Sequence, residues 1–294
     1  MRRLLLGVLA LGTLVSVAQG AAGGCDTYAE RPIETGRTPP ALPELSGLAA
    51  SHRHPGIYWA HNDSGNAFVL HAIRETGAIV ATFTILDATA LDPEDIGVGP
   101  CARNARRSCI FIADTGDNLR SRSKAQIVRV IEPDVLRSGP LIARAFPFTY
   151  ADGAHDAEAL LVDPRTAEIY VVTKSITSLG DAYRVDLGDG PLPGRAVHVA
   201  SLSPASGFDA LVTAGSVHPS GTRVLLRTYA GAWEIRLPGA TSLGDVLRSG
   251  VPRLVPSMRQ LQGEAVSYTA DGMGYFLGGE GLDTPLARVD CRRP

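Results

Sequence analysis

Apolar and polar positions alternate along this chain in short runs, and one arrangement of them occurs five times. In each copy a polar residue precedes a short apolar run, a turn follows, and a second apolar run ends at another polar residue. Short runs rich in β-branched and aromatic residues, separated by turn residues, are typical of β-hairpins. The copies run from Ser46 to Asn62, Glu94 to Asp114, Glu158 to Lys174, Thr213 to Tyr229 and Glu264 to Glu280.

The spacing of the copies indicates their architecture. The two polar ends lie 16 residues apart in four copies and 20 in the second, where the insertion from Cys101 to Cys109 adds length. A repeat of roughly 50 residues with several short strands per unit is typical of a β-propeller. The sequence therefore predicts an all-β fold, a five-bladed propeller of four-stranded antiparallel blades, in a single domain over residues 43–294. Six blades is the alternative, because the stretch from Glu94 to Glu158 is the longest.

The last copy leaves too little chain for a complete blade. Only 30 residues follow Glu264, enough for about three strands of ordinary length. We therefore expect residues 21–42 to form an N-terminal lead-in. A strand near Arg31 to Thr38 would complete the last blade and close the ring.

The first twenty residues have the pattern of a secretion signal. Met1-Arg-Arg is positively charged, the stretch from Leu4 to Ala18 is apolar, and Ala18-Gln-Gly20 is a small-x-small cleavage site. Residues 1–20 are therefore predicted to be a signal peptide, and the mature protein to be secreted or extracytoplasmic. An uncleaved membrane anchor and a lipoprotein attached through Cys25 are the lesser alternatives. We expect no other segment to span a membrane.

Export makes disulfides the expected state of the four cysteines. Cys101 and Cys109 are close in sequence and would tie off the insertion. Cys25 and Cys291 lie at opposite ends of the mature chain, and joining them would fasten the ring, whose open form has two unpaired sheet edges. This pairing is one of the three that four cysteines allow.

Charge and motifs exclude several classes of function. The formal net charge of −2 gives no global reason to expect a nucleic-acid partner. The chain has no nucleophile elbow, zincin motif or P-loop, which argues against those enzyme classes. Lysine occurs only at Lys124 and Lys174, with arginine elsewhere. We expect the protein to be a monomer.

The hairpin geometry brings charged residues to one mouth of the propeller channel. Adjacent strands of a blade are antiparallel, so the start of the first strand lies beside the end of the second. Glu158 is then next to Lys174, and Glu264 is next to Glu280. The charged residues expected at this mouth are Asp63, Glu94, Asp95, Asp114, Glu158, Glu264, Glu280, Lys174 and Arg227.

This concentration of acid predicts a metal site. Several carboxylates in a partly dry channel cannot all stay ionised without partners, and a divalent cation is the simplest remedy. Oxygen ligands in an exported protein favour Ca²⁺. A glutamate at a strand start is often merely solvated, but its recurrence at one structural point favours a shared site. The predicted metal ligands are Glu94, Asp114, Glu158, Glu264 and Glu280.

A second set of residues would contact a substrate at the same mouth. Lys174 and Arg227 are the natural partners for phosphate or carboxylate oxygens, although charge balance explains them equally well. The predicted substrate-binding residues are Asn62, Lys174, Arg227 and Tyr229.

Short motifs give the chain a family resemblance over most of residues 44–290. They include Glu94-Asp-Ile, Asp114-Thr-Gly-Asp-Asn118, Asp156-Ala-Glu-Ala-Leu160 and Gly263-Glu-Ala265. In these motifs the chain resembles secreted phytase-like or esterase-like propeller proteins. Its Glu-Ala pairs at inner strand starts are also similar to those of calcium-activated nucleotidases and, more loosely, of calcium-dependent lactonases. The resemblance implies acidic positions at Glu94, Asp114, Glu158, Glu264 and Glu280. Ser46 and Thr213 depart from it, because they place neutral hydroxyls where acids would continue the ring.

The leading hypothesis is an exported hydrolase for a phosphate ester or a related small anionic substrate. Bound Ca²⁺ would polarise the ester or activate water, with Glu158 and Glu264 as catalytic carboxylates. Lys174 and Arg227 would stabilise developing negative charge. One alternative is a lactone or carboxylic ester hydrolase. The other is a non-catalytic propeller that binds a ligand or partner at this mouth around a structural cation, because the fold alone does not select among these functions.

Overall fold

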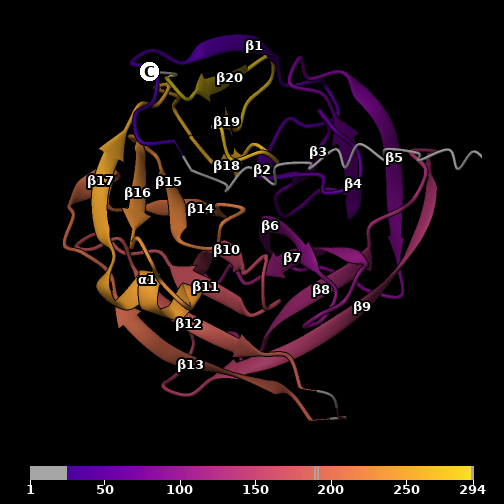
Figure 1. Cartoon of the computed structure of the whole chain (residues 1–294). Coiled ribbons are helices and arrows are strands. Elements are labelled where there is room, and N and C mark those ends of the chain that lie inside the picture. Colours follow the sequence, from indigo (N-terminus) through magenta and orange to yellow (C-terminus); the bar gives the residue numbers. More distant parts are fainter. Residues whose placement is uncertain (1–24, 189, 191, 293–294) are drawn as a thin grey trace, which may run out of the picture.

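The computed structural model describes residues 25–188, 190 and 192–292 (Figure 1). The predicted signal peptide, residues 1–20, lies outside the described residues. Within them the regular secondary structure is almost entirely β-strand, with one α-helix, α1 (Leu243–Ser249), and one short 3-10 helix, Gly207–Asp209. Ser242 caps α1 by accepting a hydrogen bond from the Asp245 backbone N–H. No helix among the described residues is long and apolar enough to cross a membrane.

Strand pairing divides the chain into five antiparallel units of four strands, which we call blades 1 to 5 (Figure 1). Blades 1 and 2 comprise β2 (Leu45–Ala50), β3 (Tyr58–Asn62), β4 (Val69–Ile73), β5 (Ile79–Leu86), β6 (Pro93–Pro100), β7 (Ser108–Asp114), β8 (Ala125–Ile131) and β9 (Gly139–Tyr150). Blades 3 and 4 comprise β10 (Ala157–Val162), β11 (Ile169–Thr173), β12 (Asp181–Asp186), β13 (Gly194–Ser201), β14 (Val212–Val217), β15 (Arg223–Thr228), β16 (Ala232–Arg236) and β17 (Val251–Val255). Blade 5 comprises β18 (Ala265–Tyr268), β19 (Gly274–Gly278), β20 (Pro285–Asp290) and β1 (Ile33–Arg37). The prediction of an all-β propeller is therefore confirmed.

The inner strands β2, β6, β10, β14 and β18 surround the middle of the ring, each in contact with the next (Figure 1). Their residues are buried on both faces, as in β10, where every residue is buried. Both faces are covered because each blade packs against two neighbours. Five separate hydrophobic clusters fill the five junctions between neighbouring blades, for example Trp59 and Phe83 of blade 1 with Ile96 and Ile112 of blade 2.

The outermost strands add one departure from the expected pattern. Strand β9 is long, and besides its antiparallel partner β8 it pairs in parallel with β5 near its start and with β13 near its end. The first three blades are thereby joined at their rims into one continuous sheet.

The N-terminal strand closes the ring, as the short stretch of chain after Glu264 predicted. Strand β1 pairs antiparallel with β20, with Ile33 opposite Arg288, and the two lie side by side in Figure 1. The disulfides Cys25–Cys291 and Cys101–Cys109 are both formed, which confirms the predicted pairing. They fit an oxidising compartment.

A buried acid reinforces this closure. Glu234 on β16 is fully buried and accepts hydrogen bonds from Tyr28 Oη at 2.6 Å and Tyr268 Oη at 2.8 Å. Arg236 and Arg253 pair with its other oxygen. The lead-in, blade 4 and blade 5 are thus joined at one point.

We expect loss of the Cys25–Cys291 disulfide to destabilise the ring strongly. The bond spans 266 residues, and a cross-link over so long a loop contributes about 2–5 kcal/mol by restricting the unfolded chain. The double variant Cys25→Ser, Cys291→Ser should therefore unfold at clearly lower urea concentration than the wild type. The matched comparison is the Cys101→Ser, Cys109→Ser variant, which removes a bond that closes only a short loop. Equal losses in the two variants would contradict this account of ring closure.

Candidate metal and substrate site

The five inner strands begin at the same mouth of the ring, and a backbone irregularity there aims the site residues. In four inner hairpins the pairing register shifts at the first residues of the inner strand, between Leu45 and Gly47, Pro93 and Asp95, Ala157 and Ala159, and Val212 and Ala214. The extra residue at each shift is Ser46, Glu94, Glu158 or Thr213. A β-bulge turns the side chain of its extra residue away from the regular alternation. Four of the five recurring polar residues at strand starts are therefore bulge residues, and the fifth, Glu264, directly precedes β18.

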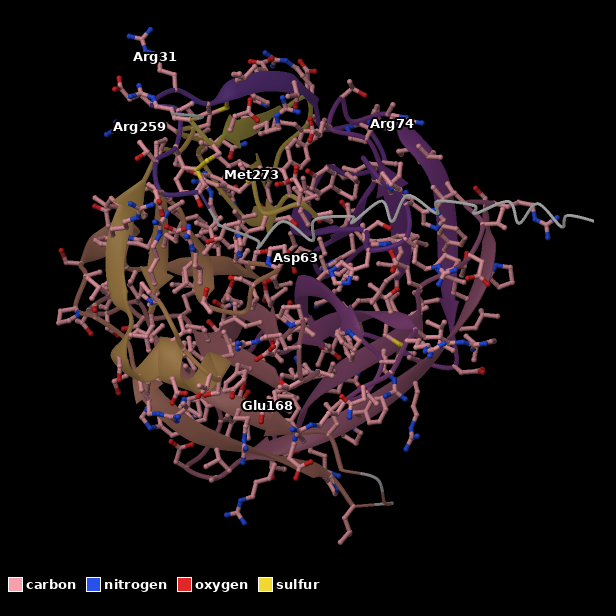
Figure 2. The ribbon with its side chains drawn as sticks, in the orientation of Figure 1. Arg31, Asp63, Arg74, Glu168, Arg259 and Met273 are labelled. Carbon is pink, nitrogen blue, oxygen red and sulfur yellow. A yellow bond between two sulfur atoms is a disulfide. The ribbon has the colours of Figure 1, made fainter. Side chains whose placement is uncertain are left out.

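The bulge glutamates form the centre of an acidic cluster. One carboxylate oxygen each of Glu94, Asp156 and Glu158 lie within 4.8 Å of one another, and the same holds for Asp63, Asp92 and Glu94. Glu94 belongs to both groups and links them. Glu94, Asp156 and Glu158 are buried, whereas Asp63 and Asp92 are half-buried. Figure 2 shows Asp63 near the middle of the ring.

Asp92 and Asp156 were missed by the sequence reasoning. Each lies two residues before a bulge glutamate, in the parallel motifs Asp92-Pro-Glu94 and Asp156-Ala-Glu158. This repeated Asp-x-Glu spacing was a readable signal. It places a second carboxylate in the loop just before the strand, above the one at the bulge.

Lys174, Tyr229 and Glu264 extend the cluster on one side. Lys174 Nζ donates to Glu158 Oε1 at 2.8 Å and to Tyr229 Oη at 3.3 Å. Its ammonium also lies 5.3 Å from the centre of the Tyr229 ring. Tyr229 is in turn hydrogen-bonded to Glu264. The predicted proximity of Glu158 to Lys174 is thus seen, and the two glutamates are bridged through Lys174 and Tyr229.

Burial controls the protonation of these acids. It raises the pKa of Glu158 to about 7 even though the Lys174 ammonium opposes the change. Burial also raises the pKa of Glu264 to about 8, with repulsion from Glu158 and Glu280 adding to the effect. The pKa of Glu94 is raised well above its usual range by burial and by the charge of Glu158. Burial and mutual proximity therefore favour the neutral forms of Glu94 and Glu158 over their ordinary ionised forms.

Lys174 stays charged throughout this range. Burial alone would lower the pKa of its amine, but the Glu158 carboxylate and the hydrogen bond to it raise the pKa above its ordinary value. The site therefore combines one fixed positive charge with several carboxyl groups that can release protons near neutral pH.

These shifts predict opposite pH responses with and without a divalent cation. The raised pKa values of Glu158 and Glu264 mean that the folded state binds more protons than the unfolded state up to about pH 7 and about pH 8. In chelator, the melting temperature should therefore fall as pH rises through this window. A bound cation needs ionised carboxylates, so stabilisation by added Ca²⁺ should grow over the same window.

The measurement is thermal melting from pH 6 to pH 9, in chelator and in Ca²⁺. The contribution of one acid is isolated as the difference between the wild type and Glu264→Gln, which removes the group that titrates at about 8. A stabilisation by Ca²⁺ that is the same at pH 6 and pH 9 would show that these carboxylates do not bind the cation.

Glycine permits a loop to cover the acids. A Cβ atom at Gly116 would lie 2.0 Å from Glu94 Oε1 and 2.5 Å from Asp92 Oδ2. Only glycine therefore allows the backbone after β7 to approach the two carboxylates so closely. The next residue, Asp117, donates its backbone N–H to Asp156 Oδ1 at 2.8 Å, which fixes that carboxylate.

Two of the predicted metal ligands, Asp114 and Glu280, are hydrogen-bonded to other side chains. Asp114 is buried and accepts hydrogen bonds from the Asp92 backbone N–H and Gln126 Nε2, and it pairs with Arg122 at 3.0 Å. Its oxygens are thus occupied in holding the loops beside the cluster. Glu280 is half-buried at the edge of the site and accepts from Gln262 Nε2 at 2.6 Å. Neither belongs to the two carboxylate groups that meet within 4.8 Å, and the predicted ligand Glu264 is also in neither group.

Two predicted substrate-binding residues also have structural partners. Arg227 is fully buried, and its guanidinium donates to Gly231 O, Ser257 Oγ, Met258 O and Gln260 Oε1. Its burial lowers the guanidinium pKa to about 10, and Glu264 opposes that shift. Arg227 thus supports the loop before Glu264. Asn62 spans the Ala41 carbonyl and the Glu44 N–H, and so anchors the lead-in.

The two hydroxyl positions join neighbouring blades. Ser46 Oγ donates to the Glu94 carbonyl, and Thr213 Oγ1 donates to the Gly263 carbonyl at 2.6 Å. Each hydroxyl therefore links its own inner strand to the start of the next blade. This explains why the acidic pattern is interrupted at these two positions.

Asp95 is the clearest correction to the sequence analysis. It was expected at the mouth beside Glu94, but it lies fully buried inside the ring. One oxygen accepts the backbone N–H groups of Leu160 at 2.7 Å and Gly215 at 2.8 Å, and the other accepts the Ile96 N–H at 2.8 Å. Because both of its oxygens are occupied by these backbone groups inside the ring, Asp95 does not join the acidic site that contains Glu94.

Comparison with known proteins adds little to this geometry. No protein-family model matches the chain, and no protein of curated function matches it. Among solved structures, the chain is similar to the apo form of the soluble aldose sugar dehydrogenase of Escherichia coli. The match has 10% sequence identity and a TM-score of 0.45, and covers 90% of this chain and 100% of that one. A likeness this distant does not bear on function.

Proposed function

We propose that this protein is a metal-dependent hydrolase of phosphate esters or related small anionic esters, with Ca²⁺ bound at the acidic mouth of the propeller. The observation that carries the proposal is the meeting of two carboxylate triplets at Glu94. Glu94, Asp156 and Glu158 would hold the cation, with Asp63 and Asp92 on its outer side. The donor set is entirely oxygen, which suits Ca²⁺ better than zinc or copper.

The surrounding residues have separate roles in this proposal. Bound Ca²⁺ would supply Lewis-acid polarisation of the ester oxygens. The Lys174 ammonium, held by Glu158 and Tyr229, stabilises negative charge that develops on the same oxygens. Glu264, with a pKa of about 8, accepts the proton of the attacking water, since a base is most effective near the working pH. Water adds to the ester centre, and the bond to the leaving alcohol breaks as that alcohol takes up a proton.

One observation favours a non-catalytic alternative. Lys174 Nζ already pairs with Glu158 at 2.8 Å, and the raised pKa values of Glu94 and Glu158 favour their neutral forms. The cluster can therefore persist without a cation, as it would in a propeller that only binds a ligand or partner. The lactone or carboxylic ester hydrolase is the second alternative, since the same residues would polarise a carbonyl.

A substrate screen tests the proposal. The protein is assayed with aryl phosphates, nucleotides, phytate, lactones and aryl carboxylic esters, each in Ca²⁺ and in chelator. We expect hydrolysis of at least one phosphate ester that chelator abolishes. Hydrolysis of lactones or carboxylic esters alone would show that the substrates are carboxylic esters and not phosphate esters. No hydrolysis of any substrate, combined with a clear Ca²⁺-induced rise in melting temperature, would establish the binding alternative. Secretion is part of the proposal and is tested by the N-terminal sequence of protein recovered from its native host.

A further inference from the structure

A separate cavity lies beside the acidic cluster, between the loop after β7 and the loop between β9 and β10. It has a volume of about 340 Å³ and includes Asp117, Lys124, Tyr150 and His155 in its lining. Asp117 also contacts Asp156 of the acidic cluster through its backbone N–H. The cavity and the cluster therefore share a wall.

The cavity contains a buried hydroxyl group without a partner. The Tyr150 hydroxyl is inaccessible to solvent and has no hydrogen-bond partner among the described residues. Tyr183 and the charged residues Asp156, Arg122 and Asp117 are its electrostatic neighbours. Leaving a buried hydroxyl unpaired costs free energy. A ligand that displaces the Tyr150 ring slightly and accepts a hydrogen bond from this hydroxyl would remove that cost.

The cavity also holds an amine that is free to pair. Lys124 is exposed, and within the described part of the chain it makes no ion pair or side-chain hydrogen bond. The other charged residues of the lining are committed. Arg122 pairs with Asp114 and donates to Gly116 O, whereas the Asp117 carboxylate accepts the Ser121 and Arg122 backbone N–H groups.

His155 and Tyr150 give the cavity an aromatic side. Their rings meet edge to face with centroids 4.9 Å apart. His155 Nε2 lies 3.0 Å from Asp152 Oδ1 and 3.0 Å from the Tyr183 hydroxyl, which fixes the ring. A planar apolar group can rest on such a surface.

We propose that this cavity binds the oxyanion of a small molecule, of the phosphonate, phosphate or carboxylate class, with Lys124 as the charge partner and the Tyr150 hydroxyl as hydrogen-bond donor. The aromatic side would contact the ring or apolar part of the same molecule. The further assignment of the cavity as a substrate subsite rests on the proposed function. Binding itself does not depend on it.

The scarcity of lysine makes the proposal directly testable. Only Lys124 and Lys174 carry side-chain amines, and Lys174 is paired with Glu158 and stays protonated. Brief acetylation with a neutral reagent in chelator should therefore modify Lys124. Peptide mass spectrometry measures the rate of this acetylation. Phenylphosphonate or benzoate at about ten times its dissociation constant should slow that rate about tenfold. Benzyl alcohol and sodium chloride at equal ionic strength should not.

A tyrosine variant tests whether protection of Lys124 from acetylation depends on the cavity. Tyr150→Phe should weaken protection of Lys124 at least about fivefold, because it removes one hydrogen bond to a charged acceptor. Tyr170→Phe, a tyrosine that bonds Glu168 outside the cavity, is the matched control and should protect like the wild type. Equal slowing by sodium chloride, or full protection in Tyr150→Phe, would overturn the proposal. Protection of Lys124 without hydrolysis of any ester would contradict only the proposed function. Hydrolysis without protection of Lys124 would contradict only this inference.

Discussion

Replacing Glu158 by glutamine should abolish both stabilisation by Ca²⁺ and Ca²⁺-dependent hydrolysis. Glu158 contacts Glu94, Asp156 and Lys174 at once, so its carboxylate is central to the proposed cation site. For a site saturated about 100-fold above its dissociation constant, bound cation contributes about 2.7 kcal/mol to the free energy of unfolding. We expect that contribution to vanish in Glu158→Gln. The catalytic rate should fall by about 100-fold or more, as for other variants that lose a preorganised charge.

Two further measurements separate loss of function from loss of fold. Glutamine has nearly the shape of glutamate and still accepts a hydrogen bond from Lys174. In chelator at pH 8 the variant should still unfold cooperatively at a temperature near that of the wild type, because loss of the ion pair with Lys174 destabilises it while relief of the crowding of Glu94 and Asp156 stabilises it. Glu168→Gln, at the opposite end of the β10–β11 hairpin, should leave cation binding and hydrolysis unchanged. Retention of the full Ca²⁺ effect by Glu158→Gln would refute the site.

Replacing Asp95 by alanine should be among the most destabilising single changes in the protein. Its carboxylate accepts backbone N–H groups from β6, β10 and β14, and so joins three blades inside the ring. Each buried donor left without a partner costs about 1–3 kcal/mol, so we expect a loss of about 3–5 kcal/mol in the free energy of unfolding. Urea unfolding followed by tryptophan fluorescence measures it.

Asparagine at this position is the more informative second variant. Asp95→Asn keeps one acceptor oxygen, which can serve Leu160 and Gly215, and loses the acceptor for Ile96. Its loss should therefore be clearly smaller than that of alanine. Asp134→Ala, at an exposed position that pairs with Arg53, should change stability by less than about 0.5 kcal/mol. If Asp95→Ala costs no more than Asp134→Ala, the central role of Asp95 is wrong.

Much of the fold could be predicted because it depends on local patterns. Two apolar runs around a turn specify a hairpin, and repeating that hairpin about every 50 residues specifies a ring. The short C-terminal remainder predicted that β1 would complete the last blade, and the positions of Cys25 and Cys291 predicted their bond. The same reasoning brought Glu94 and Glu158 together, since the starts of inner strands meet at one mouth.

Side-chain direction could not be predicted in the same way. Glu94 and Asp95 are neighbours in sequence, yet the bulge aims one at the acidic mouth and the other into the ring. Asp114 and Arg227 have charges suited to a site, but each finds partners in a neighbouring loop. Asp92 and Asp156 join the cluster only because loops position them above the strands.

The sequence by itself therefore determined the repeat, the ring closure, both disulfides and the mouth at which acids gather, because each follows from periodicity or spacing along the chain. The tertiary structure decided which carboxylates meet, which are occupied by backbone and arginine partners, and where the Tyr150 cavity lies. Those outcomes depend on bulges and on contacts between blades far apart in sequence. The alternation of apolar and polar residues within one strand does not fix them, since a shift of one residue reverses the face to which a side chain points.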